Sequence, residues 1–272
     1  MRSYIDTALL LLRFLEGYGL PTDVTLITRE HVELFLDDQL RRWRPATAAV
    51  RYRSLRQLFG WLVGDQRIAV SPMERMGAPK VPEEPVTVVH DDDLRRLLAT
   101  CGSGRFEDVR DAALLRLMIE TGVRLSEAAG IKIDDLDLSN RCIEVLGKGR
   151  RRRTVPIGAR TCEALRIYLA VRGGHRQSFG PGLWLSVKGT LTTSGITQML
   201  RRRCARAGIG SIHPHQFRHT AAHDWRAAGG SEGDAMRLFG WRSRDMLSRY
   251  GAVLADQRAR ASFERLAPGD RF

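Results

Sequence analysis

The chain is organised around residues 213–250, HPHQFRHTAAHDWRAAGGSEGDAMRLFGWRSRDMLSRY. His215 and Arg218 lie three residues apart, a spacing that places both on one face of a helix, where both side chains can bind the same oxyanion. Tyr250, beside Arg249, closes the stretch, and a tyrosine hydroxyl becomes a covalent nucleophile once its surroundings activate it. An arginine, a histidine and a tyrosine in one segment of a very basic protein indicate phosphoryl chemistry on nucleic acid.

The composition is that of a folded and strongly basic protein. Of 272 residues, 43% are apolar and 28% are charged, and lysine plus arginine (44) exceed aspartate plus glutamate (31) by 13. A pI near 10.5 makes a polyanion the expected partner. Nucleic acid fits better than an anionic membrane, because the basic residues are spread through helical patterns and one hairpin. No apolar run approaches the roughly 18 residues of a spanning helix, so we expect no membrane segment.

The first residues and the cysteines favour a cytoplasmic protein, which a nucleic-acid partner would make nucleoid-associated. Residues 1–19 carry Asp6 and Glu16 in an amphipathic pattern and lack a small-residue cleavage site, which favours a structural helix over a signal peptide. The cysteines lie far apart without a CxxC pair, so they predict neither a zinc ribbon nor a disulfide framework: Cys101, Cys142, Cys162 and Cys204. We expect free thiols in a reducing compartment.

Residues 1–80 are predicted to form a small helical domain. The first helix ends near glycines 17 and 19 and carries one apolar face, made of Ile5, Ala8, Leu9, Leu12 and Leu15. Thr28 can cap a second helix, and Thr47 can start a third that ends near Gly64. The third helix presents a basic stripe outward, made of Arg51, Arg53 and Arg56. Such a stripe is either a solvated face or a contact with the DNA backbone, and the pattern leaves both open.

A linker and a second domain follow. Residues 78–85, APKVPEEP, hold three prolines, which favour extended chain, and we place the interdomain linker at residues 81–89. Residues 90–272 form the second domain. Residues 90–93, HDDD, fit the start of a helix better than a metal site, because acids complement the helix dipole there. A helix over about residues 108–120, a hairpin over residues 142–157 and further helical patterns after residue 160 make the chain mainly α with one small antiparallel β-sheet.

Two further residues have the setting for phosphate chemistry. Arg124 follows a glycine in a tight turn, and Glu127, three residues on, can hold its guanidinium in a fixed pose that clamps a phosphate. Lys148 lies between two glycines in the hairpin turn, but the GKG is not a nucleotide-binding loop, because the remaining motif residues are absent. Lys148 is either an ordinary exposed lysine or one that reaches a scissile phosphate, with residues 150–153 against the DNA backbone.

The histidines and aromatic residues of residues 213–250 can also be explained as structural residues without a role in chemistry. His215, His219 and His223 recur every four residues, yet no HExxH motif, cysteine or carboxylate completes a zinc site, and Arg218 would crowd a cation. We therefore expect no metal. Trp241 and Tyr250 are ordinary packing residues unless the fold gathers cations around them, because a free tyrosine, with a pKa of about 10, is a poor nucleophile.

Together these positions resemble the tyrosine recombinase, or phage integrase, family. The matching segments are TGVRLSEAAGI (residues 121–131), GKG (147–149), HPHQFRH (213–219) and LFGWRSRDMLSRYG (238–251), with RPATAAVRYRSLRQLFGWLV (44–63) and SPM (71–73) in the first domain. Four boxes in the right order with suitable gaps are highly specific. Trp241 stands where many members have histidine, and the family tolerates both.

The resemblance implies a role for each site residue. Tyr250 attacks a DNA phosphate, which forms a 3′-phosphotyrosyl link and frees a 5′-hydroxyl. Arg124 and Arg218 neutralise the phosphate, and Lys148 protonates the leaving oxygen. The supporting roles are general acid and base chemistry for His215, donation to the phosphate for Trp241, support for Glu127, and contact with the DNA backbone for Arg150, Arg151 and Arg152. Neither ATP nor a metal or other cofactor is implied, since the covalent link conserves the bond energy.

The resemblance also implies an architecture and partners. The helical core-binding domain and the catalytic domain would clamp double-stranded DNA that carries inverted half-sites. The amphipathic tail, residues 254–266, would dock on a neighbouring protomer in a homo-tetramer, or in an assembly with a related recombinase. The short N-terminus favours a simple recombinase without an arm-binding domain. The target sequence, the need for a directionality factor and the choice between integration, excision, resolution and transposition stay open.

Two other functions compete with strand exchange. A non-catalytic architectural DNA-binding protein on the same scaffold is disfavoured, because a degenerate member would have lost at least one of five positions that are all present here: Arg124, Lys148, His215, Arg218 and Tyr250. A relaxing topoisomerase of the same chemistry would act on DNA without a specific site. An architectural protein would form no covalent adduct with DNA. A recombinase would form the adduct at a specific site, and a topoisomerase would act on DNA that lacks such a site.

Overall fold

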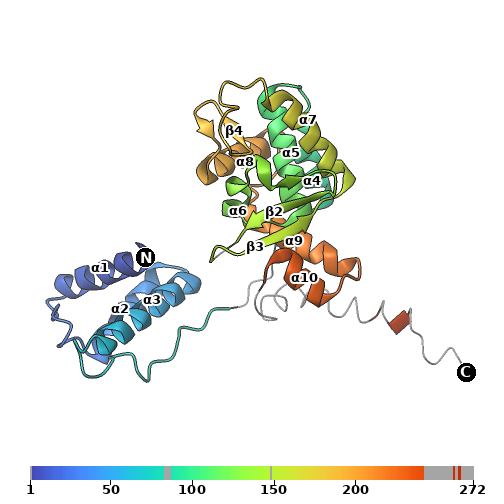
Figure 1. The fold of residues 1–272 in the computed structure, drawn as a ribbon. Helices are drawn as coiled ribbons and strands as arrows, with labels where there is room; N and C mark the ends of the chain where they lie inside the picture. The colour runs from blue at the N-terminus through green and yellow to red at the C-terminus, as the bar shows by residue number, and fades with distance from the viewer. Residues whose placement is uncertain (1, 83–86, 148, 242–259, 261–262, 265–272) are drawn as a thin grey trace, which may run out of the picture. The chain divides into compact units, whose positions relative to one another are not determined.

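The structure is a computed structural model of the chain, and it describes residues 2–82, 87–147, 149–241, 260 and 263–264. The chain divides into two compact units, Met1–Glu84 and Pro85–Phe272 (Figure 1). The division falls within residues 81–89, where the proline-rich sequence predicts a linker. Lys148, Tyr250 and all of residues 254–266 except 260, 263 and 264 lie outside the described residues.

The first unit consists of α1 (Arg2–Gly17), α2 (Arg29–Arg42) and α3 (Pro45–Gly64). All three pack on one another around a shared apolar core, whose most buried members are Leu15, Val32, Phe35, Leu55 and Phe59. Thr28 is the N-cap of α2, as its sequence predicts, and its backbone N–H donates to His31 Nδ1 at 3.2 Å. The Tyr52 hydroxyl donates a hydrogen bond to the Met76 carbonyl, which fixes the chain after α3.

The buried face of α1 differs from the expected one. Thr7, Leu11 and Leu15 are buried, whereas Ile5 and Leu9 are 56% and 46% exposed. Four consecutive leucines, residues 9–12, make the middle of this helix apolar all round. Periodicity alone therefore did not identify the inward face, which is the one that packs against α2 and α3.

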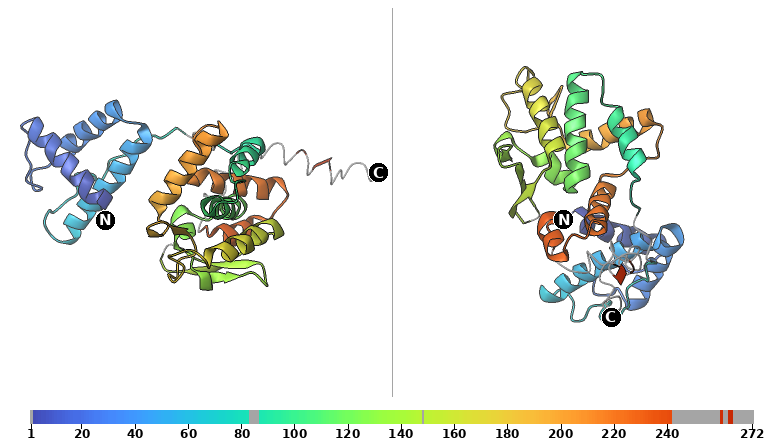
Figure 2. Two further views of the ribbon diagram at one scale, coloured as in Figure 1. Left: turned by 90° about the horizontal axis from the view of Figure 1, so that it is seen from above. Right: turned by 90° about the vertical axis from the view of Figure 1, so that its right-hand side faces the viewer.

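The second unit is built around α5 (Phe106–Thr121), which packs against α7 (Ala159–Arg172) and α9 (Pro214–Ala227). In the left view of Figure 2, α5 is seen nearly end-on among the other helices of this unit. Between residues 87 and 241, the other helices that the structure describes are α4 (Asp91–Ala99), α6 (Leu125–Gly130), α8 (Thr193–Ala207), α10 (Glu232–Phe239) and the 3₁₀ turn Ile133–Asp135. The core of the unit is centred on Leu97, Leu114, Met118, Trp184 and Phe217.

Two small antiparallel sheets complete the second unit. The larger has the order β1 (Leu136–Asp137), β2 (Cys142–Leu146), β3 (Arg152–Pro156), with Ile143 opposite Val155 and Val145 opposite Arg153. The mainly α class with an antiparallel sheet is thus confirmed. The second sheet, β4 (Leu185–Ser186) with β5 (Gly189–Thr190), corrects the expectation of one sheet. Strands of two residues are too short to show a period of two in the sequence.

A buried ionic cluster ties α5 to α8. Arg203 donates to Asp108 at 2.5 Å and to Asp111 at 2.6 Å, and Arg110 donates to Asp111 at 2.7 Å and to the Leu185 carbonyl. Each of the four charged side chains is at most 5% exposed. Removing one partner would leave a buried charge uncompensated, at a cost of roughly 3–5 kcal/mol. Within the described residues, no helix is long and apolar enough to cross a membrane.

Candidate active site

Arg124 lies at a tight turn between α5 and α6. The turn begins at Gly122, whose φ of 56° is a left-handed conformation that costs glycine little. A Cβ on Gly122 would lie 3.1 Å from the Arg218 Cα and 3.2 Å from the Phe239 Cε1, so glycine allows α9 and α10 to approach this closely. Arg124 then forms the N-cap of α6. The fold therefore brings Arg124 and Arg218, 94 residues apart, to one place.

Glu127 fixes the pose of Arg124. Arg124 Nη1 donates to Glu127 Oε1 at 2.7 Å, and the Arg124 backbone N–H donates to Oε2 at 3.0 Å. This is the ion pair that the three-residue spacing predicts. Burial raises the pKa of the Glu127 carboxyl, but hydrogen bonds from Arg153 and from the Arg124 backbone outweigh burial and lower the pKa to about 2. Glu127 is therefore ionised at neutral pH and holds a preorganised guanidinium.

Arg218 is nearly inaccessible, with 1% of its surface exposed. Its Nη1 donates to the Gly122 carbonyl at 2.9 Å, and its Nη2 donates to the Phe239 carbonyl. Its Cζ lies 5.1 Å from the centroid of the Trp241 ring, which itself contacts the Phe239 ring in a tilted arrangement, with the ring centroids 4.9 Å apart. Arg218 thus joins the turn before Arg124 to the end of α10, and Trp241 contacts this cation.

Arg124, His215 and Arg218 line a single pocket of about 550 Å³. The other described residues that line it are Val123, Leu125, Ser126, Thr193, Thr197, His213 and Pro214. Two arginines and a histidine on one cavity supply the charge and the donors that an oxyanion needs. The structure therefore gathers three of the expected site residues. Trp241 contacts Arg218 but is not among the lining residues of this pocket, and Lys148 and Tyr250 lie outside the described residues.

The two histidines of this region are held neutral. Burial lowers the pKa of His215, and the neighbouring charges of Arg218 and Arg124 lower it further. The ring of His219 lies 4.5 Å from that of His215, edge to face. Burial, together with the nearby His215 and Arg218, lowers the pKa of His219 to about 4. Neutral imidazole accepts protons, so His215 is suited at pH 7 to act as a general base at the pocket.

The two sequence clusters that invited a metal interpretation have other contacts. His215 and His219 contact each other edge to face, and His223 lies 3.2 Å from Asp224. The aspartates at the start of α4 pair with arginines one turn later: Asp91 and Asp92 with Arg95, and Asp93 with Arg96. In the part of the chain that the structure describes, no group of three or more histidine, cysteine or acidic side chains could hold a metal ion.

The hairpin arginines differ in their surroundings. Arg150 and Arg151 are exposed, and Arg152 pairs with Glu144 at 2.6 Å. Arg153 contradicts the expectation that all of residues 150–153 face the DNA backbone, because it is 15% exposed and bound to Glu127. Its sequence position carried a signal that was missed: strict alternation with the buried Val155 places Arg153 on the inward face of the strand.

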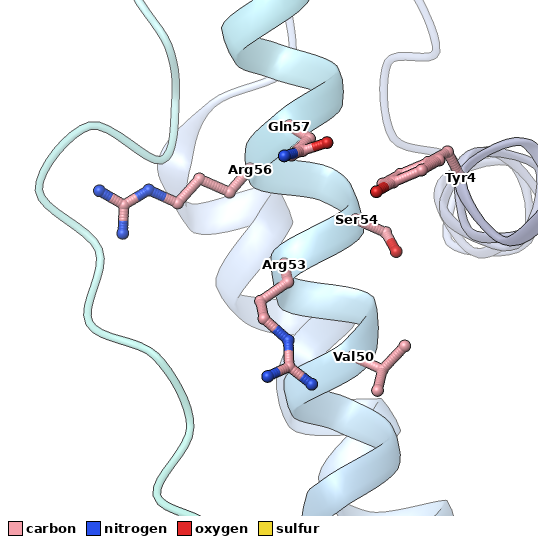
Figure 3. Close-up of a pocket in the computed structure, with 6 residues that line it drawn as sticks. All are labelled: Tyr4, Val50, Arg53, Ser54, Arg56 and Gln57. Carbon is pink, nitrogen blue, oxygen red and sulfur yellow. The ribbon is translucent and has the colours of Figure 1, made fainter. Parts of the chain in front are cut away.

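The basic stripe of α3 borders a hollow beside α1. Figure 3 shows Arg53 and Arg56 projecting from α3, with Arg56 on the side of the helix away from Tyr4 of α1 and Ser54 on the side nearer to it. Both arginines are exposed. Arg51 is half-buried instead, with its Cζ 5.1 Å from the Trp43 ring, and burial lowers its pKa. Arg53 and Arg56 are thus better placed than Arg51 for contact with a polyanion.

The sequence matches a known family over most of the second unit. The model of the phage integrase family matches residues 87–257. The tyrosine recombinase XerC of Actinobacillus pleuropneumoniae is 34% identical over 183 residues, which cover 66% of this chain and 60% of that protein. XerC of Herpetosiphon aurantiacus is 31% identical over 231 residues, which cover 82% of this chain and 74% of that protein. The chain thus spans less than two thirds of the first relative and about three quarters of the second.

Solved structures share the fold at lower identity. The XerH site-specific recombinase bound to a palindromic difH substrate matches with a TM-score of 0.77 and 20% identity, over 95% of this chain and 79% of that one. A lambda integrase dimer bound to a core site matches with a TM-score of 0.70 and 17% identity, over 91% and 86%. The family model covers more than half of the chain, and a relative above 30% identity aligns along most of its own length. The chain therefore belongs to the phage integrase family.

Proposed function

We propose that this chain is a site-specific DNA recombinase that cleaves and rejoins DNA strands through a 3′-phosphotyrosyl intermediate. The observation that carries the proposal is the single pocket lined by Arg124, His215 and Arg218. These residues come from two distant segments, and each matches a position of the family's phosphate-binding boxes. A surface that only binds DNA needs charge, but it does not need a buried arginine and a neutral histidine beside a preorganised guanidinium.

The cleavage step divides among these residues and two that the family resemblance assigns. The Tyr250 hydroxyl attacks the scissile phosphorus, and the bond from phosphorus to the 5′-oxygen breaks. His215 accepts the tyrosine proton, and Lys148 gives a proton to the leaving 5′-oxygen. Arg124 and Arg218 stabilise the extra negative charge of the pentavalent transition state. Attack by another 5′-hydroxyl reverses these transfers and restores the tyrosine, so rejoining needs no ATP.

The lowered pKa of His215 supports this division of roles. At neutral pH a neutral imidazole is ready to take a proton during cleavage and to return it during rejoining. Glu127 stays ionised, because its pKa is about 2, and so keeps Arg124 fixed throughout the cycle. Trp241 packs against Arg218, 5.1 Å from its Cζ, and its indole N–H is assigned to a phosphate oxygen by the family resemblance alone.

The proposed partner is double-stranded DNA with inverted half-sites, clamped between the core-binding and catalytic domains. The net charge of +13 and the exposed Arg53 and Arg56 support a polyanionic partner. We place the protein in the cytoplasm, associated with the nucleoid, and with no membrane partner.

A homo-tetramer, or an assembly with a related recombinase, is the proposed active form. Phe263 of the tail is 68% exposed, so its ring is not covered by its own protomer. An apolar groove of about 530 Å³ on the second unit offers a place for a neighbour's tail, with a lining that includes Ile119, Val155, Ile157, Trp225 and Phe239.

The test is covalent capture of DNA. The protein is incubated with nicked duplexes that carry inverted repeats from the DNA flanking its gene, and adducts are separated in detergent. Wild-type protein is expected to form an adduct, and Tyr250→Phe is expected to bind the same DNA without forming one. Equal adduct from the Phe variant would end the proposal. Binding without any wild-type adduct would favour an architectural protein, and relaxation of plasmid lacking the site would favour a topoisomerase.

A further inference from the structure

Arg153 of β3 joins three segments that lie far apart in the sequence. Its Nη1 and Nη2 donate to the two carboxylate oxygens of Glu127, at 3.1 Å and 2.8 Å. Its Nε donates to the carbonyl of Leu238, near the end of α10, at 3.1 Å. All three nitrogens of the guanidinium thus donate to one buried carboxylate or to one backbone carbonyl, and the side chain is only 15% exposed.

Two glycines let other chain segments approach this guanidinium. A Cβ on Gly240, which caps α10 at a φ of 62°, would lie 3.3 Å from Arg153 Cζ, Nε and Nη1. A Cβ on Gly147, the residue after β2, would lie 3.5 Å from Arg153 Nη1 and from Glu127 Oε1. Arg153 therefore packs against the residue before Lys148 and the residue before Trp241 while it holds the partner of Arg124.

We propose that Arg153 is a positioning residue for DNA cleavage, which orients Arg124 through Glu127 and fixes that pair to the end of α10. This inference rests on the proposed recombinase function. Glu127 Oε1 accepts from Arg124 Nη1 at 2.7 Å and from Arg153 Nη1 at 3.1 Å, and Oε2 accepts from the Arg124 backbone N–H and from Arg153 Nη2, so both arginines set the rotation of the carboxylate. Without Arg153, Glu127 would keep its bonds to Arg124 but lose both bonds to β3, and with them its connection through Arg153 to the Leu238 carbonyl of α10.

The side chain is not available to DNA in the way that its sequence neighbours are. Its N–H groups point at Glu127 and Leu238, and its charge is offset by the Glu127 carboxylate. Arg150 and Arg151, by contrast, are exposed. Loss of Arg153 should therefore slow the chemical step and leave DNA affinity nearly unchanged, whereas loss of a backbone contact would weaken affinity.

The experiment compares Arg153→Lys with Arg110→Lys. Arg110 is a matched control, because it also holds one buried carboxylate, Asp111, and one backbone carbonyl, that of Leu185, but at the other end of α5. Lysine keeps the charge in both variants and removes the fork. Melting temperature, DNA affinity and the single-turnover rate of adduct formation on saturating nicked DNA are measured for each, with wild type and Tyr250→Phe in the same series.

Arg153→Lys is expected to slow adduct formation by about 10- to 100-fold, the scale of a small misplacement of catalytic groups, with affinity within about threefold. Both variants are expected to lower the melting temperature by similar amounts, because each loses the same kinds of hydrogen bond. Arg110→Lys is expected to leave the rate of adduct formation within about twofold of wild type. A rate for Arg153→Lys within about twofold of wild type, or an equal loss in Arg110→Lys, overturns the inference and leaves the recombinase function intact. Absence of any wild-type adduct overturns both.

A double-mutant cycle with Glu127→Gln tests the route of the effect. If Arg153 acts through Glu127, adding Arg153→Lys to Glu127→Gln costs less than about threefold in rate, because the carboxylate that Arg153 orients is already gone. Rate losses that multiply in the double variant would show that Arg153 acts independently of Glu127, and would overturn the inference.

Discussion

Arg218 donates a hydrogen bond from Nη1 to the carbonyl oxygen of Gly122, 96 residues earlier in the chain, at 2.9 Å. The same guanidinium donates from Nη2 to the carbonyl of Phe239, so one side chain of α9 satisfies the ends of α5 and α10. A cation that lines the proposed phosphate pocket is therefore also a structural element of that pocket. Its substitution should affect stability and chemistry together, which distinguishes it from Arg124.

Arg218→Lys is expected to destabilise the second unit and to abolish efficient cleavage. The single ammonium of lysine keeps the charge but cannot donate to two carbonyls on different sides, so at least one is left unpaired in a buried place. We expect a loss of about 2 kcal/mol in the free energy of unfolding. The rate of adduct formation should fall by about 10²-fold or more, as when a transition-state donor is removed. Urea denaturation and single-turnover cleavage measure the two effects, and an unchanged denaturation midpoint would contradict the first.

Gly122→Ala tests the close approach at the turn before Arg124. Both the positive φ and the contact with the Arg218 Cα, 3.1 Å from the added Cβ, oppose alanine. Gly104→Ala is the control, because Gly104 has a φ of 74° and open space around it. We expect a loss of about 1 kcal/mol at Gly104 from strain alone, and of about 3 kcal/mol at Gly122, where the backbone of α9 must also move. Equal losses in urea denaturation would show that crowding at Gly122 contributes nothing.

Local spacing predicted more of the site than composition did. The pairs Arg124 with Glu127 and His215 with Arg218 follow from helical geometry, which a sequence shows directly. The inward position of Arg153 was missed because a run of four arginines is read as a solvated surface, although the strand period places it inside. The bond from Arg218 to Gly122 joins residues 96 apart, and no local pattern encodes such a contact.

Glu127→Gln is expected to remove an acid-sensitive part of the stability. The pKa of Glu127 is about 2 in the fold against an ordinary 4.5, so the ionised carboxylate stabilises the folded state. That contribution is fully present above pH 4.5 and is lost as the pH falls from there through about 2, and it is on the order of 3 kcal/mol. The difference in unfolding free energy between wild type and Glu127→Gln, measured by urea titrations, should become smaller as the pH falls over this range. A difference that stays constant with pH would contradict the assignment.

His215 should set the acid limb of the cleavage reaction. Because burial, Arg218 and Arg124 lower its pKa below 6.5, the neutral base prevails above that lowered value. The second-order rate constant for adduct formation at limiting DNA reports the free protein, so it should rise with pH and level off before about pH 6.5. His215→Ala should react about 10²-fold more slowly and lack this inflection. A wild-type rate that falls as the pH rises through the same range would assign the required form to the protonated imidazole.

Arg53→Gln tests whether the exposed face of α3 contacts DNA phosphates. Each phosphate contact releases condensed counterions, so its loss should reduce the slope of log affinity against log salt by about 1, uniformly across DNA sequences. Arg29→Gln is the control, because Arg29 is paired with Glu33 at 2.7 Å on α2 and already has its charge offset. Fluorescence anisotropy over a series of salt concentrations measures both slopes. If Arg53→Gln leaves the slope at its wild-type value, or if Arg29→Gln lowers it equally, the basic stripe is only a solvated face.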